Sequence, residues 1–141
     1  MRYTAFGATF EIETATLDVD GATLRAQLAA YERGEREAFD VSVTYPDGFT
    51  GDVMRAMAAI PYGETRTYGD LAETLDSAAV AVGQACGRNP VAIVVPCHRV
   101  VAADGLGGFS LDHPDAVAVK RRILEHEGAR DDRPRQTTLP V

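Results

Sequence analysis

The chain has 141 residues, 45% of them hydrophobic, and its 21 acidic and 14 basic residues give a formal net charge of −7. This length allows one core of ordinary size, and the acidic balance argues against a non-specific nucleic-acid binder, which normally neutralises phosphates with basic side chains. Lys120 is the only lysine, and an acidic, lysine-poor surface keeps a protein soluble in concentrated salt, so we expect a halophilic source.

Residues 1–48 are predicted to form a small antiparallel sheet with one helix. Apolar and polar residues alternate in 3–6 and 9–17, on either side of a glycine, as they do in a β-hairpin. Two leucines and a tyrosine at helical spacing then predict a helix over 22–33, and a strand-like run follows at 39–45. We expect this part to be a short, variable α/β domain.

No signal peptide or membrane span is expected at the start of the chain. The stretch 1–17 contains Glu11 and Glu13 and lacks the uninterrupted apolar segment that either would need. We therefore expect a cytoplasmic protein that does not contact a membrane, and we expect a monomer.

A boundary is predicted at Pro46-Asp47-Gly48, after which the pattern becomes helical. An apolar stripe predicts a helix over 50–60, and Thr67 is suited to cap a second, short helix. The pair Asp76-Ser77 is suited to cap a third helix over 78–86 after a very short turn. Two short helices joined in this way predict a helix-turn-helix.

The third of these helices consists almost entirely of small residues, so its backbone is able to lie very close to whatever faces it. One interpretation is tight packing against neighbouring helices, which is the usual role of small helical residues. The other is a helix that enters a groove of a partner. This segment taken alone favours packing.

The run 89–99 combines an apolar stretch with reactive side chains. Residues 91–95 predict a buried strand, because the asparagine before a proline ends the helix and the stretch is too short for another one. Cys97 follows, beside two basic residues that would favour the thiolate, its reactive form. A cysteine is more often an inert core residue, and that interpretation suits Cys86 better. With only two cysteines and no secretory signal, reduced thiols are expected.

The two residues after Cys97 each have an ordinary alternative. Adjacent side chains on a strand point in opposite directions, so a link between Cys97 and His98 needs a turn or a water, and otherwise His98 is a solvated loop residue. Arg99 is alternatively a structural donor to backbone carbonyls.

A glycine-rich loop at 103–110 precedes a predicted helix at 114–127 whose Val117, Ile123 and Leu124 are expected to face the core. Glycines allow the backbone to approach a ligand closely, although most such loops are only connections. The loop has no phosphate-binding pattern.

The motifs over 50–128 resemble, in order and nearly in spacing, the C-terminal domain of the O6-alkylguanine-DNA alkyltransferases, the methylated-DNA–protein-cysteine methyltransferases. The matching motifs are Ile60-Pro61-Tyr62-Gly63-Glu64, Thr67-Tyr68-Gly69-Asp70-Leu71-Ala72, Ala81-Val82-Gly83, Asn89-Pro90, Pro96-Cys97-His98-Arg99-Val100 and Leu124-Glu125-His126-Glu127-Gly128. The resemblance implies an α+β protein with a short variable domain at 1–48, a winged-helix-like helix-turn-helix alkyltransferase domain at 49–130, and a polar tail at 131–141.

The resemblance implies a DNA repair protein that transfers an alkyl group from O6-alkylguanine irreversibly to its own Cys97, once per molecule and without a cofactor or metal. The base would be flipped out of the duplex, because its O6 carbon cannot be attacked inside the stack. Glu127 would orient His98, which would deprotonate Cys97 through a water. Asn89 would hold the turn before the reactive segment.

The same resemblance implies which residues bind the substrate. Tyr68 would donate a hydrogen bond to the base and the backbone amide of Ser110 would donate one to O6. The carbonyls of Cys97 and Val100 would accept from the exocyclic amine, and Phe109 would stack over the base where the family usually has tyrosine. The small-residue helix would enter the minor groove. The residues expected to contact DNA are Ala78, Ala79, Val80, Gly83 and Arg99.

One departure from the family concerns delivery of the base. The family has an arginine immediately before Ala-Val-Gly, where it fills the space left by the flipped base, and this chain has Val80. Valine offers an apolar plug without charge, so we expect less efficient extrusion from duplex DNA. One alternative is a module that binds alkylated bases without reacting, against which Cys97 argues. Another is a small structural or redox-responsive protein, which would explain the thiol but not Asn89, Tyr68 and Glu127.

Overall fold

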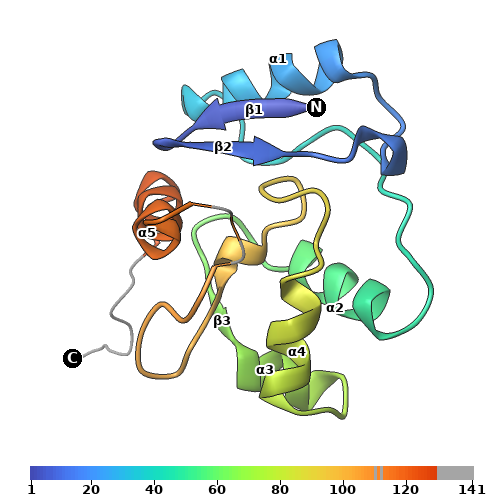
Figure 1. Ribbon diagram of the computed structural model, residues 1–141, viewed down its shortest axis with the longest axis vertical. Coiled ribbons are helices and arrows are strands. Elements are labelled where there is room, and N and C mark those ends of the chain that lie inside the picture. Colours follow the sequence, from blue (N-terminus) through green and yellow to red (C-terminus); the bar gives the residue numbers. More distant parts are fainter. Residues whose placement is uncertain (110, 112, 130–141) are drawn as a thin grey trace.

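The computed structural model describes residues 1–109, 111 and 113–129, and it is an α+β protein (Figure 1). The described residues contain five α-helices and two small two-stranded sheets. No helix among them is long and apolar enough to span a membrane. The predicted tail at 131–141 lies outside the described residues.

The first 48 residues, here called the N-terminal unit, contain the predicted hairpin and helix. Its elements are β1 (Arg2–Ala5), β2 (Ala8–Glu11), a 3₁₀ turn (Thr14–Thr16) and α1 (Gly21–Glu32). The strands are antiparallel, with Arg2 opposite Glu11, and alternate residues of both are buried. The Asp20 side chain caps α1 by accepting a hydrogen bond from the backbone amide of Thr23 at 2.8 Å.

The strand predicted at 39–45 is wrong. This segment pairs only through an isolated bridge between Leu17 and Val43. The reason is that the chain after β2 turns into the 3₁₀ helix, which leaves no long strand edge for the segment to join. The predicted second strand, 9–17, is correspondingly short, because its ladder ends at Glu11.

The rest of the chain is mainly helical. Its elements are α2 (Phe49–Ala58), β3 (Arg66–Thr67), α3 (Tyr68–Thr74), α4 (Ala79–Cys86), a 3₁₀ turn (Cys97–Arg99), β4 (Val100–Val101) and α5 (Ala116–His126). Helices α2, α3 and α4 pack together below the N-terminal unit, and β3 pairs with β4 in parallel (Figure 1).

The predicted caps of α3 and α4 have different outcomes. Thr67 caps α3 in a capping box with Asp70, as predicted. The cap predicted from Asp76 and Ser77 is wrong, because α4 begins after Ala78 with no side-chain cap. Asp76 has a φ of 53°, a left-handed conformation that helices do not contain, so the turn extends further than predicted.

The strand predicted at 91–95 is also wrong, and a buried turn stands in its place. The backbone amide of Val95 donates to the carbonyl of Val91 at 3.0 Å, and Ile93 has a φ of 75°. The Asn89 side chain spans the turn, donating to the carbonyl of Val95 at 2.8 Å and accepting from the amide of Val91 at 3.1 Å. The turn therefore satisfies its buried backbone without a neighbouring strand.

Helix α5 joins the two parts of the molecule. Ile123 and Leu124 are buried in it as predicted, whereas Val117 is 42% exposed, so its predicted core position is wrong. Val117 lies six residues before Ile123 and therefore about 120° away around the helix. The N-terminal unit docks here through Arg122, whose guanidinium donates to the carbonyl of Phe6 at 3.0 Å.

Candidate active site

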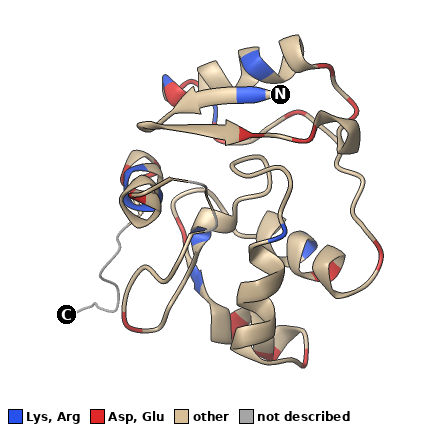
Figure 2. Ribbon diagram, in the orientation of Figure 1, with Lys and Arg blue, Asp and Glu red and all other residues tan. Residues whose placement is uncertain are grey.

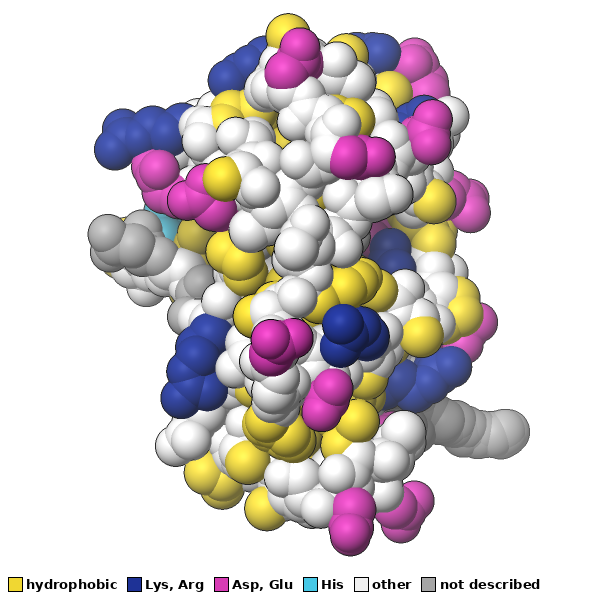
Figure 3. Space-filling model, turned by 90° about the vertical axis from the view of Figure 1, so that its right-hand side faces the viewer, with side chains coloured by type: hydrophobic (Ala, Val, Ile, Leu, Met, Phe, Trp, Pro, Cys, Tyr) yellow, Lys and Arg dark blue, Asp and Glu magenta, His cyan; other side chains and the backbone are white. Residues whose placement is uncertain are grey.

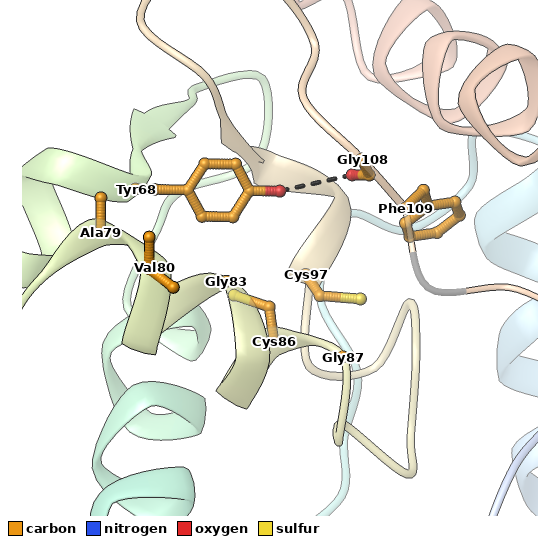
Figure 4. A pocket seen from close by; sticks show the side chains of 9 residues that line it. All are labelled: Tyr68, Ala79, Val80, Gly83, Cys86, Gly87, Cys97, Gly108 and Phe109. Atoms are coloured by element: carbon orange, nitrogen blue, oxygen red, sulfur yellow. Dashed lines mark hydrogen bonds between the residues drawn. The ribbon is translucent and has the colours of Figure 1, made fainter.

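A pocket of about 500 Å³ lies between α3, α4, the turn that holds Cys97 and the glycine-rich loop (Figure 4). Its lining residues are Tyr68, Ala79, Val80, Gly83, Cys86, Gly87, Cys97, Gly108 and Phe109. Six of the predicted site residues thus meet in one cavity. Ser110 lies outside the described residues, so its predicted contact with O6 is not described.

Cys97 opens the 3₁₀ turn Cys97–Arg99 and is almost fully buried, with 9% of its surface exposed. Burial raises the pKa of its thiol, and a hydrogen bond from the Asn89 side chain and the charge of Lys120 oppose this in part. The nearby cation is therefore Lys120 rather than the two basic neighbours in sequence. At rest the sulfur is a thiol.

His98 is fully buried, which rules out the solvated loop histidine. Its Nε2 lies 2.9 Å from Oε2 of Glu127. An ionised carboxylate only accepts hydrogen bonds, so Nε2 carries the proton and Nδ1 is free to accept one. Nδ1 has no hydrogen-bond partner among the described residues. Burial lowers the pKa of His98, although Glu127 opposes this, so the imidazole is neutral and a potential base.

Glu127 follows the end of α5 and accepts four hydrogen bonds. Its Oε2 accepts from the Tyr31 hydroxyl at 2.6 Å, from His98 at 2.9 Å and from Arg99 Nη2 at 2.9 Å, and its Oε1 accepts from Arg99 Nε at 2.8 Å. Burial alone would raise the pKa of this carboxyl, but these donors hold it well below its usual range. Glu127 is therefore a fixed negative charge behind His98.

Arg99 does not have the geometry of a DNA contact. It is buried, it binds Glu127, and its Nη1 donates to the carbonyl of Ile60 at 2.7 Å. Its guanidinium also lies 5.7 Å from the centre of the Tyr62 ring. This arrangement agrees with the alternative that Arg99 is a structural donor, and it argues against the expected contact with DNA.

Lys120 belongs to the site and was not found by the sequence argument. It is fully buried, and its Nζ donates to the carbonyls of Val100 at 2.6 Å and Gly108 at 2.8 Å. The Tyr68 hydroxyl lies 3.4 Å from the same nitrogen. Burial lowers the pKa of Lys120 to about 8. The available signal was its place three residues before Ile123, on the face of the helix that is buried.

Tyr68 is the first residue of α3, and its ring reaches across the pocket toward the glycine-rich loop (Figure 4). Its hydroxyl donates to the carbonyl of Gly108 at 3.3 Å, and burial raises its pKa to about 12. Gly107 must remain without a side chain, because a Cβ there would lie 2.8 Å from the Tyr68 ring. Val100, expected to accept from the base, already accepts from Lys120.

Cys86 is buried as expected, but it also lines the pocket. Its sulfur lies 3.5 Å from that of Met57, and burial raises its pKa to about 12, so it is far less easily ionised than a free thiol. Both cysteines are free thiols. Among the described residues no group of three or more His, Cys, Asp and Glu side chains is placed to hold a metal ion.

The two helices beside the pocket carry no basic side chain. Helix α4 carries no charged side chain, α3 carries Asp70 and Glu73, and basic side chains gather on α5 instead (Figure 2). Val80 is 73% exposed at the edge of the pocket. The face in Figure 3 has scattered charges of both signs around hydrophobic side chains in its lower half.

Comparison with known proteins places these features in a family. Residues 48–129 match the model of the 6-O-methylguanine DNA methyltransferase DNA-binding domain. A methylated-DNA–protein-cysteine methyltransferase of Methanosarcina acetivorans is 45% identical over 108 residues, which are 73% of this chain and 66% of that protein. One of Mycolicibacterium paratuberculosis is 52% identical over 103 residues, which are 68% of this chain and 62% of that protein.

A solved structure of a similar protein has the same fold. The crystal structure of Mycobacterium tuberculosis OGT in complex with DNA is 42% identical, with a TM-score of 0.68, over 79% of this chain and 70% of that one. The chain therefore shares the fold of that protein, and it spans slightly less than two thirds of the length of the two relatives named above.

Proposed function

Because the chain belongs to the 6-O-methylguanine DNA methyltransferase family, we propose that it repairs DNA by transferring an alkyl group from O6-alkylguanine to its own Cys97. The observation that carries this proposal is a buried thiol at the wall of an open pocket, next to a neutral histidine whose Nδ1 has no partner among the described residues. A buried imidazole nitrogen with an unshared lone pair is able to accept a proton.

The reaction begins with a proton transfer. Nδ1 of His98 accepts the thiol proton of Cys97 through a water, and Glu127 stabilises the imidazolium that forms. The thiolate attacks the alkyl carbon in line with the bond that joins this carbon to O6. The bond between sulfur and the alkyl carbon forms as the bond between that carbon and O6 breaks. The electron pair of the broken bond remains on O6 of the guanine.

Charge that develops on the base is stabilised from the opposite wall. The Tyr68 hydroxyl, which donates to the carbonyl of Gly108 in the free protein, turns its proton toward the base, and the buried ammonium of Lys120 lies behind that hydroxyl. The thioether that forms on Cys97 is chemically stable and does not return its alkyl group. Each molecule therefore reacts once.

Delivery of the base is assigned to α3 and α4 acting as a helix-turn-helix. Helix α4 enters the minor groove, the alkylated base rotates into the pocket, and Val80 takes its place as an apolar plug. The exposed edge of Val80 beside the pocket supports this arrangement. The protein works as a monomer in the cytoplasm, and its acidic composition supports a halophilic source.

The mass of the intact protein tests this function. After incubation with an O6-methylguanine oligonucleotide, or with free O6-benzylguanine, we expect one alkyl adduct per molecule, and peptide mapping should place it on Cys97 and not on Cys86. The variant Cys97→Ala should gain no mass.

The same experiment separates the alternatives. Unchanged mass with binding that depends on the lesion would support a non-reacting module that flags alkylated bases. Unchanged mass without such binding would leave the third alternative, a small structural or redox-responsive protein. Both arms are run in low and in high salt, because the net charge of −7 makes DNA binding sensitive to screening.

A further inference from the structure

The N-terminal unit sends one side chain into the active-site network. Tyr31 lies near the end of α1 and is 1% exposed, and its hydroxyl donates to Oε2 of Glu127 at 2.6 Å although the two residues are 96 positions apart. That oxygen is also the one that binds His98. A single oxygen atom, Oε2 of Glu127, therefore links the N-terminal unit to the base of the proposed reaction.

The surroundings of Tyr31 fix the direction of this hydroxyl. Its ring packs against those of Phe39 at 5.5 Å, His126 at 5.1 Å, Phe6 at 6.2 Å and Tyr62 at 6.3 Å between centres. Its own carbonyl lies 2.8 Å from Nε2 of His126. A ring held by four others cannot swing away, so the donor is preorganised.

We propose that Tyr31 is a positioning residue of the alkyl transfer, because its hydroxyl holds the Glu127 carboxylate in the orientation and charge distribution that His98 requires. This inference rests on the proposed function. It gives the N-terminal unit a part in the chemistry without any contact with the substrate.

The pKa of His98 depends on how many donors share the negative charge of one carboxylate oxygen. Oε2 of Glu127 has three donors, and removing the Tyr31 hydroxyl leaves two, His98 and Arg99. The oxygen then carries more negative charge toward His98 and holds the imidazolium proton more strongly, which raises the pKa of His98. A base that is already protonated cannot accept the thiol proton, so the reaction would need a higher pH.

The charged and titratable groups that face this pair are few. The turn Cys97–Arg99 contributes its cysteine thiol and guanidinium, α5 contributes the ammonium of Lys120, and Tyr62 lies near Glu127. The cations Lys120 and Arg99 lower the pKa of His98. Removing one neutral hydroxyl leaves all of these groups in place.

The test uses Tyr31→Phe, which removes the hydroxyl and keeps the ring. The matched control is Tyr3→Phe, because Tyr3 also belongs to the N-terminal unit and its hydroxyl also donates to a carboxylate, that of Glu32. The first measurement is an NMR titration of His98, which is simple because the chain has only three histidines. The second is the rate of alkyl transfer as a function of pH.

We expect Tyr31→Phe to raise the titration midpoint of His98 by about half to one pH unit, and to move the acid side of the rate profile by the same amount. Below that midpoint the transfer should slow roughly threefold to tenfold, and well above it the rate should approach that of the unaltered protein. Tyr3→Phe should change neither measurement.

A His98 midpoint and a rate profile that coincide with those of the unaltered protein would overturn the proposal, and so would a loss of rate that is equal at every pH. If Tyr31→Phe does not fold, Tyr31→3-fluorotyrosine keeps the test open, because its more acidic hydroxyl should move the midpoint to lower pH. If the unaltered protein transfers no alkyl group, the proposed function fails, and the titration of His98 still decides this inference.

Discussion

Lys120 shows how a single residue is used in an otherwise lysine-free chain. Its ammonium is fully buried and donates to two backbone carbonyls and to the Tyr68 hydroxyl, so it is not exposed to solvent. An unpaired ammonium in such a place would be strongly unfavourable. Its hydrogen bonds to the carbonyls of Val100 and Gly108 offset the cost of burying the charge. The same bonds hold the backbone of the glycine-rich loop at the pocket wall.

The variant Lys120→Met should slow alkyl transfer at least tenfold at neutral pH, because a charge near both the thiol and the base is lost. The free energies of unfolding of the unaltered protein and of Lys120→Met should also depend differently on pH. The pKa of Lys120 is lowered from 10.5 to about 8, so between these values the unfolded chain binds this proton and the folded chain does not. The unaltered protein should therefore gain stability relative to Lys120→Met as the pH rises from 8 to 10.5.

Urea unfolding across that pH range measures the difference, which should reach about 3 kcal/mol at most. Arg121→Met, on the neighbouring position of α5, is the control and should show no such pH dependence. A difference between the unaltered protein and Lys120→Met that stays constant from pH 8 to 10.5 would contradict the assignment.

Sequence reasoning found the residues of the site that lie within recognisable motifs. Cys97 and Tyr68 line one pocket, and His98 binds Glu127 beside the turn that holds Cys97. The same reasoning gave Arg99 a DNA contact, because a motif does not reveal which way a side chain points. Tyr31 was missed because its importance depends on a contact 96 positions away, which no local pattern contains.

At the scale of elements, the buried turn at 91–95 shows why a run of apolar residues is ambiguous. Alternating Val and Ile side chains are buried in it as they would be in a strand. What differs is the backbone, which bonds to itself and to the side chain of Asn89. That asparagine was the available signal, since a side chain that both donates and accepts is able to replace a neighbouring strand.

Helix α4 combines small residues with an exposed Val80 and no charge, which suits close approach to DNA but supplies no attraction to phosphates. The variant Val80→Arg should tighten binding to duplex DNA roughly tenfold at 0.1 M salt and steepen its dependence on salt concentration by about one unit. It should speed transfer from duplex DNA more than transfer from free O6-benzylguanine, because only the duplex requires base extrusion.

Fluorescence anisotropy at several salt concentrations measures the binding. Val117→Arg is the matched control, because it adds the same charge at the other large hydrophobic residue that is exposed among those the structure describes, on α5 and away from the pocket lining. Equal gains from both variants would mean that net charge alone limits binding and that Val80 has no special place.

At the scale of the whole molecule, a net charge of −7 repels itself at low salt. Screening should therefore stabilise the fold, and we expect the unfolding temperature to rise by roughly 3–5 °C, or about 1 kcal/mol, between 0.1 and 2 M KCl. Calorimetry in KCl, with sucrose as an uncharged control, measures this. An unfolding temperature that falls with KCl, or that rises equally in sucrose, would contradict adaptation of the surface to salt.

The hydrogen bond between Tyr31 and Glu127 also bears on when the active site is assembled during folding. Contacts between residues so distant in the chain form after shorter loops have closed. During synthesis Cys97 leaves the ribosome before Glu127, so its thiol at first has no carboxylate behind the histidine. Under the proposed mechanism a nascent chain is thereby protected from using up its one reaction, and the first thiol able to react belongs to a finished, folded molecule.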